Sequence, residues 1–163
     1  MNNIQKPKDY SKAISLKYPE QVIIAIAKDR DNTPNPITLG WTMITSHKPP
    51  MMAISVAFNR YSCEVIKEAG EFVITFPRLE MAEDALFYGT RSGRDMCKIA
   101  EFGTRTEPCE KIDCVIFSDA VANFECRLKG ELETGDHAIF AGEILQSWVH
   151  PDKTDRLYTV GSG

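Results

Sequence analysis

The 163-residue sequence lacks the features that mark membrane, secreted and nucleic-acid-binding proteins. No run approaches the roughly 20 apolar residues that a helix needs to cross a bilayer. The N-terminal stretch MNNIQKPKDYSKAIS has no apolar segment of the secretory-signal type. The net charge of −4 is opposite in sign to the basic surface of a general nucleic-acid binder. We therefore expect a cytoplasmic protein with no membrane and no nucleic acid among its partners.

Metal-binding and disulfide patterns are missing as well. The five cysteines are odd in number and include no CxxC pair, and the three histidines do not stand at zinc-type spacing. We predict no metal site and reduced thiols. Cys109 and Cys114 are close enough in sequence to form a redox pair across a short loop, an alternative that the sequence leaves open.

Neither of the common nucleotide-binding motifs is present. The sequence contains no GxGxxG run and no GxxxxGK[ST] run. It also lacks the long helices that alternate with strands in a doubly wound parallel sheet. With 43% apolar and 26% charged residues, and with no repeat or linker, residues 1–163 are expected to form a single domain. Residues 1–19 are polar and are expected to form an N-terminal arm.

What the sequence does contain is a series of strand-like runs. Residues 122–129 alternate apolar and polar side chains, the pattern of an antiparallel strand with one face exposed. Thr134-Gly135-Asp136 predicts a hairpin turn after it. We predict strands at Gln21–Lys28, Ile37–His47, Met51–Phe58, Glu71–Phe76, Ala120–Leu132, His137–Val149 and Leu157–Val160. About seven strands in hairpin order favour a mainly β fold with short helices, arranged as a closed or nearly closed antiparallel barrel.

Three short helices are predicted between these strands: Ser62–Ala69, Leu79–Tyr88 and Arg94–Phe102. For the first, Ser62 is the expected N-cap and Gly70 the expected stop. The segment Gly103–Asp113 is expected to be a loop. Gly40 is expected to bend or bulge the strand that contains it.

The corner Asn59-Arg60-Tyr61-Ser62 is the first candidate binding site. It places a cation and a hydroxyl directly before a helix whose first amides have no partner within the helix, and such helix starts bind phosphate. The TLGWT run offers hydroxyls, a glycine and one large aromatic ring. Thr38 and Thr42 can point the same way unless a bulge intervenes. We expect these two pieces to bind one flat, phosphorylated cofactor, although Arg60 could equally be an ordinary surface residue.

These runs, taken in order, resemble a known family. NPITLGWTM, SHKPP, MMAISV, NRYS, GEFVITFP, GTRSGRDMCK, NFECRL and GDHAIFAGEI are similar to segments of the flavin reductase-like proteins, which include flavoredoxin and have an FMN-binding split-barrel fold. The resemblance extends from about residue 21 to residue 149. It implies a split antiparallel β-barrel that forms a homodimer, with one flavin per subunit near the subunit interface. The implied cofactor is FMN or FAD, and the implied electron donor is NADH or NADPH.

The resemblance also implies roles for particular residues. A first group would contact the flavin ring and ribityl chain, namely Thr38, Leu39, Gly40, Trp41 and Thr42. A second group would meet the phosphate or ribityl end, namely Asn59, Arg60, Ser62, Ser92, Arg94, Asp95 and Lys98. His137, in the GDH run, would lie near the nicotinamide or the flavin ring and is the candidate catalytic residue.

Each of these assignments has a simpler alternative. Trp41 could belong to the core, shield one flavin face or close a dimer contact. His137 could be a surface histidine. Arg94, Asp95 and Lys98 could form a solvated first turn of a helix.

For the whole chain, the leading function is an NAD(P)H:flavin oxidoreductase. One alternative is an FMN-bound electron carrier or ferric reductase that passes electrons to a protein or a ferric chelate. The other is a non-enzymatic ligand-binding barrel.

Overall fold

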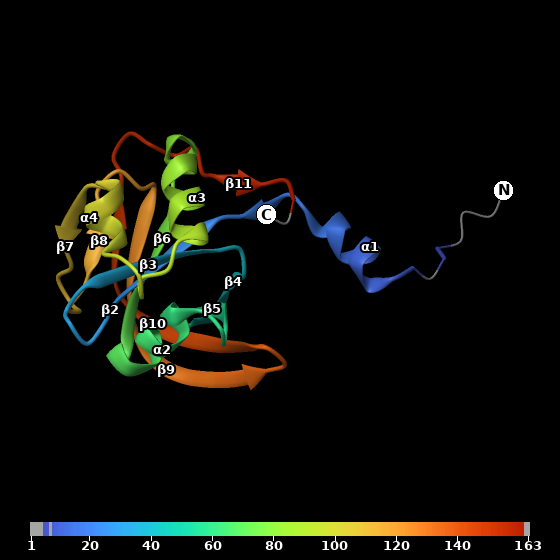
Figure 1. Ribbon diagram of the computed structural model, residues 1–163, viewed down its shortest axis with the longest axis horizontal. Coiled ribbons are helices and arrows are strands. Elements are labelled where there is room, and N and C mark those ends of the chain that lie inside the picture. The colour runs from blue at the N-terminus through green and yellow to red at the C-terminus, as the bar shows by residue number, and fades with distance from the viewer. Residues whose placement is uncertain (1–4, 7, 162–163) are drawn as a thin grey trace.

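The computed structural model describes residues 5–6 and 8–161. Its main feature is one antiparallel sheet of seven strands in the order β3-β2-β6-β9-β10-β5-β4 (Figure 1). The strands are β2 (Ile23–Lys28), β3 (Pro34–Leu39), β4 (Thr42–His47), β5 (Pro50–Ala57), β6 (Glu71–Phe76), β9 (Ala122–Thr134) and β10 (His137–Val149). This confirms the prediction of a mainly β fold with short helices.

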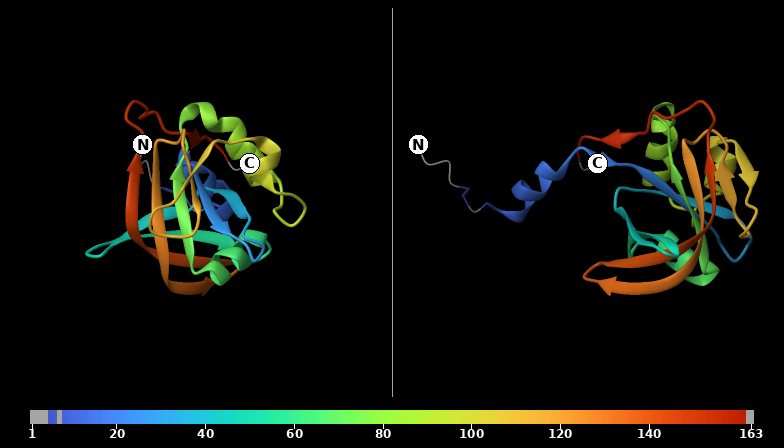
Figure 2. Two further views of the ribbon diagram at one scale, coloured as in Figure 1. Left: turned by 90° about the vertical axis from the view of Figure 1, so that its left-hand side faces the viewer. Right: turned by 180° about the vertical axis from the view of Figure 1, so that it is seen from behind.

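The two edge strands of this sheet, β3 and β4, are consecutive in the chain. Only Gly40 and Trp41 separate them, so the sheet must curl until its two edges meet at that corner. Elsewhere the edges are not paired with each other, and the result is a split barrel, as the resemblance predicted (Figures 1 and 2). The predicted single strand Ile37–His47 is wrong, because the chain turns this corner at residues 40–41 and the first strand already begins at Pro34.

Two small ribbons complete the β-structure. β1 (Glu20–Gln21) pairs with β11 (Tyr158–Thr159), which brings the start of the barrel segment beside the last strand. β7 (Thr106–Pro108) pairs with β8 (Val115–Phe117) in a hairpin. Part of the predicted loop Gly103–Asp113 is therefore strand. β7 has only three residues and ends in proline, so it is too short for side-chain periodicity to reveal it.

The helices are short and lie against or beyond the sheet. They are α1 (Tyr10–Ile14), η1 (Ser15–Lys17), α2 (Tyr61–Ala69), η2 (Leu79–Met81), α3 (Ala82–Thr90) and α4 (Lys98–Phe102). In Figures 1 and 2 the segment with α1 projects from the barrel as an arm, and α1 has no buried residue. Residues 1–4 and 7 of the predicted arm lie outside the described residues. None of the described helices is both long and apolar enough to span a membrane.

Two predicted helix starts are wrong. Helix α2 begins at Tyr61, so Ser62 is not the N-cap; it is buried, and its hydroxyl accepts a 2.8 Å hydrogen bond from the Asn35 amide. The helix predicted from Arg94 begins only at Lys98, because the preceding residues form a turn around Ser92. The predicted stop at Gly70 is confirmed: this glycine has a φ of 66°, in the left-handed region.

The core lies on both faces of strand β2. Ile23 and Ala25 pack inside the barrel with Phe72 and Phe140, beneath helix α2. The alternate residues of β2, such as Ile24, pack on the other face with α3 and the β7–β8 hairpin. Because β2 is covered on both sides, it holds α3 beside strand β3, and this arrangement positions the candidate site.

Candidate functional site

The corner between β3 and β4 is shaped by Gly40 and Trp41. A Cβ atom at Gly40 would lie 3.1 Å from the carboxyl group of Glu20, so a glycine lets strand β1 approach closely. Trp41 is 47% exposed, which excludes a core role. The nitrogen of Lys17 lies 5.5 Å from the centre of its ring and forms an ion pair with Glu20 at 2.5 Å.

A cleft of about 1020 Å³ opens beside this corner. That volume is at the upper end of the roughly 300–1,000 Å³ of cofactor and ligand sites. Its walls come from β3, the corner after β5, helix α3 and the β1–β11 ribbon. Seven predicted site residues line it, namely Thr38, Leu39, Gly40, Trp41, Asn59, Arg60 and His137.

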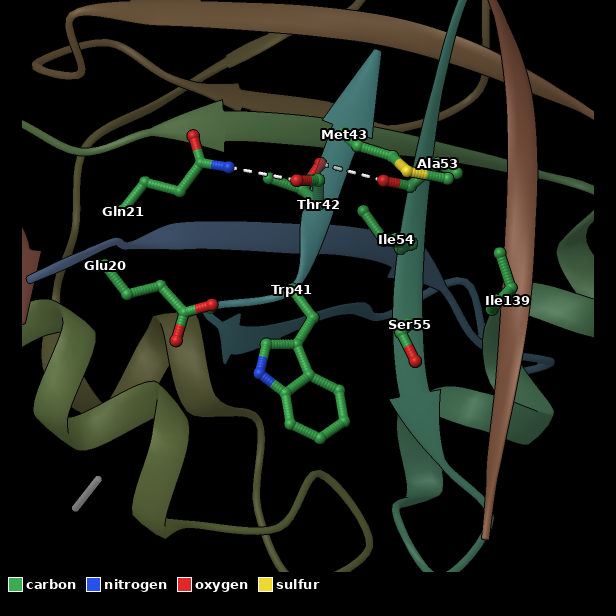
Figure 3. A pocket seen from close by; sticks show the side chains of 10 residues that line it. Glu20, Gln21, Trp41, Thr42, Met43, Ala53, Ile54, Ser55 and Ile139 are labelled. Atoms are coloured by element: carbon green, nitrogen blue, oxygen red, sulfur yellow. Dashed lines mark hydrogen bonds between the residues drawn. The ribbon is translucent and has the colours of Figure 1, made fainter. Parts of the chain in front are cut away.

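A smaller pocket of about 270 Å³ adjoins the cleft at Trp41 (Figure 3). Thr42 lines this pocket and not the cleft. Its hydroxyl donates to the carbonyl of Ala53 at 2.8 Å, whereas the Thr38 hydroxyl donates to the carbonyl of Ala85 at 2.6 Å. The two threonines thus face different elements, because the break at residues 40–41 interrupts the strand alternation.

His137 is held against Trp41 at the rim of the cleft. The centres of the two rings are 4.7 Å apart, and Nδ1 of His137 lies 2.6 Å from a carboxylate oxygen of Asp136. This hydrogen bond, together with the charge of His137, lowers the pKa of Asp136. Since Asp136 occupies Nδ1, the remaining ring nitrogen, Nε2, is the one left for another partner.

Arg60 stands where the cleft meets the start of helix α2. Its side chain is exposed, and within residues 5–6 and 8–161 no carboxylate forms an ion pair with its guanidinium. Four other arginines do form such pairs, namely Arg30, Arg78, Arg94 and Arg105. Arg60 is therefore a cation at a helix N-terminus with room for an anion.

Lys98 is a buried cation close to Arg60. It is 3% exposed, and its Nζ contacts only two carbonyl oxygens, those of Tyr88 at 3.4 Å and Arg91 at 3.3 Å. Burial, followed by the positive charge of Arg60, lowers the pKa of Lys98 to about 8. No carboxylate of the described chain neutralises this pair of cations, so the arrangement favours a bound anion such as phosphate.

The other predicted residues are not part of the cleft wall. The Arg94 guanidinium bonds to Glu64 at 2.6 Å and lies over the ring of Tyr61. The Ser92 hydroxyl accepts a hydrogen bond from the Arg94 amide, and Asp95 is exposed in the same turn. Ser62 is buried against Asn35. These four residues, and the buried Lys98, are not among the residues that line the cavity.

Several cleft residues carried no sequence signal. Tyr18 lies in the segment interpreted as a polar arm, Glu20 lies directly after that segment, and residues 157–160 lie in the predicted last strand. Helix α3 contributes Ala85, Leu86 and Gly89. A Cβ atom at Gly89 would lie 3.3 Å from the Cβ of Thr38, so the glycine lets the helix lie close to β3. The described part of the chain holds no group of three or more metal-ligating side chains.

Comparisons with known proteins found one family and several related chains that are similar to this one. Residues 15–162 match the family described as flavin reductase like domain. A protein of Archaeoglobus fulgidus, described as uncharacterized, is 36% identical over 112 residues, which make up 69% of this chain and 63% of that protein. The chain thus spans less than two thirds of that relative.

Two solved structures are also similar. Flavoredoxin of Desulfovibrio vulgaris (Miyazaki F) is 29% identical with a TM-score of 0.76, over 82% of this chain and 72% of the other. The NADH:FAD oxidoreductase of Streptomyces globisporus C-1027 has a TM-score of 0.84 at 19% identity, over 99% of this chain and 96% of the other. At that identity the second likeness concerns the fold alone.

Proposed function

This chain belongs to the flavin reductase-like family, as the order of its sequence motifs predicted, and from this premise we propose that it is an NAD(P)H:flavin oxidoreductase that holds FMN in the large cleft. Electrons pass from NADH or NADPH to the flavin and from there to an acceptor. The observation that carries this proposal is the cation Arg60 in the cleft wall, with the buried cation Lys98 close behind it and no carboxylate partner for either among the described residues.

The phosphate end of the flavin is assigned to this pair. The guanidinium of Arg60 suits a phosphate because it offers parallel N–H donors, and the first amides of helix α2 add further donors. Lys98 supplies a second positive charge from behind the cleft wall. Its Nζ contacts the carbonyls of Tyr88 and Arg91, and the residues between these two line the cleft. The pKa of Lys98 is lowered first by burial and then by the charge of Arg60. A phosphate dianion bound beside Arg60 offsets the repulsion between the two cations.

The flavin ring is assigned to the corner at the other end. Residues Thr38 to Trp41 offer a flat, partly apolar wall with backbone groups that can bond the polar edge of the ring. When bound, flavin supplies the redox chemistry, because it accepts a hydride from a reduced nicotinamide. The protein's own task is to place two rings face to face and to exclude water.

His137 is assigned to orienting the nicotinamide. Asp136 fixes its imidazole through Nδ1, and Trp41 packs on the ring, so Nε2 has one defined direction at the cleft rim. A positioned hydrogen bond to the carboxamide of the nicotinamide fits this arrangement. No acid or base side chain is required for hydride transfer itself.

The test is the visible absorption spectrum of purified protein loaded with FMN, recorded anaerobically before and after one equivalent of NADH or NADPH. Stoichiometric bleaching faster than for free FMN is expected. Protein that binds no FMN, or bound FMN that neither nucleotide bleaches, contradicts the proposal.

An electron carrier is the second candidate, because the chain is 29% identical to a flavoredoxin. A carrier shares the cleft and the phosphate site but has no need for a nicotinamide subsite. Bound FMN that dithionite reduces at once and that NADH and NADPH reduce only slowly favours the carrier over the reductase.

We also propose that the protein works as a homodimer through the exposed edge of β4. Met43 and Ile44 are 59% and 63% exposed on this edge strand, beside Trp41. An edge strand with unpaired backbone groups and exposed apolar side chains tends to associate with another protein chain. Light scattering is expected to report a dimer, and Ile44→Lys is expected to dissociate it. Val149→Lys, at an exposed position at the end of strand β10, is expected to leave the dimer intact. A wild-type monomer contradicts this proposal.

A further inference from the structure

Two cysteines meet across the β7–β8 hairpin, none of whose residues lines the cleft. Cys109 follows β7 and Cys114 precedes β8. The Cys109 amide donates to the Cys114 carbonyl at 3.0 Å, which continues the antiparallel pairing of Pro108 with Val115. The cysteines are therefore neighbours in space as well as in sequence.

Their side chains also interact. The Cys114 thiol lies close enough to raise the pKa of the Cys109 thiol, and burial raises this pKa further. The Cys114 thiol in turn lies 3.5 Å from the Ile26 carbonyl, its own acceptor. Cys114 is 4% exposed, whereas Cys109 is half-buried and can be reached from solvent.

The loop between the two cysteines is held by other contacts. The carboxylate of Glu125, which is fully buried, accepts the amides of Glu110 at 3.0 Å and Lys111 at 2.6 Å. It also accepts the indole N–H of Trp148 at 2.7 Å. Glu125 therefore holds this loop independently of the two cysteines.

The backbone spacing suits a disulfide. Paired residues of an antiparallel ladder have Cα atoms about 4.5–5.5 Å apart. Disulfides span Cα separations of roughly 4.4–6.8 Å. The other cysteines are placed differently: Cys97 is exposed, and Cys63 and Cys126 are buried in the core inside the barrel.

We propose that Cys109 and Cys114 form a redox-modification site that closes to an intrachain disulfide by exchange with a small-molecule disulfide such as glutathione disulfide. Cys109, the cysteine of the pair that solvent reaches, loses its proton to the buffer, and this minor thiolate form attacks one glutathione sulfur, breaks the S–S bond and releases one glutathione thiolate. The Cys114 thiolate then attacks the Cys109 sulfur and displaces the second. Two protein thiols are oxidised, one glutathione disulfide is reduced, and the two protons end on the released glutathione thiols.

The proposal is independent of the flavin and is tested on the full chain without it. Folded protein is equilibrated with glutathione buffers from fully reduced to fully oxidised, quenched with acid, alkylated and mapped by mass spectrometry. The peptide that contains Cys109 and Cys114 is expected to lose two hydrogen atoms as the buffer becomes oxidising and to gain no glutathione.

Two variants serve as controls. Cys114→Ser is expected to leave a stable glutathione adduct on Cys109, because the second exchange cannot occur. Cys97→Ser is expected to leave the formation of the disulfide unchanged. The proposal is wrong if both Cys109 and Cys114 remain alkylatable in a buffer that modifies Cys97. It is also wrong if Cys109 of the wild type carries glutathione or pairs with Cys97.

Discussion

Lys98 allows a quantitative prediction about flavin binding. In the protein without ligand the pKa of Lys98 is lowered to about 8 from the ordinary 10.5, by burial and by the charge of Arg60. A bound phosphate dianion adds an opposite charge beside the ammonium and raises this pKa again. FMN binding is therefore coupled to the uptake of a proton wherever unliganded Lys98 is neutral.

The sign and size of the effect follow from these pKa values. Below about pH 8 Lys98 is charged in both states, and FMN affinity is independent of its titration. Above about pH 8 the affinity falls by up to tenfold for each pH unit, until the pKa of the bound state is reached. A full return to 10.5 corresponds to roughly 3 kcal/mol of binding free energy, at about 1.4 kcal/mol per pKa unit.

Stability without ligand should change in the opposite direction. Since the folded pKa is lowered, the unfolded chain binds more protons between about pH 8 and pH 10.5, so the free energy of unfolding rises with pH across that window. Lys98→Met removes this rise and also removes the pH dependence of FMN affinity.

The assay is fluorescence titration with FMN and, as the matched control, riboflavin, which has the same ring and no phosphate. Affinities are compared at about pH 7 and about pH 9, where FMN is expected to weaken by roughly tenfold and riboflavin to stay constant. Calorimetry in buffers of different ionisation enthalpy counts the protons taken up. An FMN affinity that is flat with pH, or an unchanged slope in Lys98→Met, refutes the assignment of Lys98 to the phosphate.

Three further substitutions test other parts of the site and its support. Asp136→Asn loosens His137 and is expected to lower kcat/KM for the nicotinamide severalfold through KM, with FMN affinity unchanged; an unaltered KM removes His137 from that subsite. Glu125→Ala leaves three partly buried N–H donors without their acceptor and is expected to cost about 3 kcal/mol in the free energy of unfolding, measured with urea; a loss below about 1 kcal/mol, roughly the level of a surface change, contradicts this. Gly93→Ala places a Cβ 2.2 Å from the side-chain oxygen of Asn35. The overpacking is expected to lower the free energy of unfolding by about 1–3 kcal/mol and to lower the affinity for FMN more than that for riboflavin. A variant that melts and binds FMN like the wild type contradicts this, because the turn before Lys98 then accommodates the extra methyl group.

Much of the fold could be predicted from local patterns. Alternation along residues 122–129 and the apolar run at residues 51–57 report which faces are covered, so the strands and the hairpin order followed directly. The corner at Gly40 was anticipated only as a bend. Periodicity cannot show that two strands at opposite edges of one sheet meet there, because this depends on closure of the whole barrel.

The candidate site was harder to predict for a related reason. Arg60 and the TLGWT run were found because each carries its chemistry within a few neighbouring residues. Glu20 and Tyr158 were missed because the pairing of β1 with β11 joins two segments that are far apart in the sequence, and a local pattern does not report such a contact. For Lys98, the sequence indicated a charged residue in a helix but gave no sign that it is buried and without a carboxylate partner among the described residues.

The central claim is that the phosphate of FMN lies between Arg60 and Lys98 while the ring occupies the corner at Trp41. The most direct measurement is the ratio of FMN to riboflavin affinity in the wild type and in Arg60→Ala. Loss of a charged hydrogen-bond donor of about 1–3 kcal/mol predicts that the substitution lowers this ratio by about 5- to 150-fold and leaves riboflavin affinity unchanged. Equal affinities for the two ligands in the wild type, or an equal loss of both in Arg60→Ala, would contradict the claim.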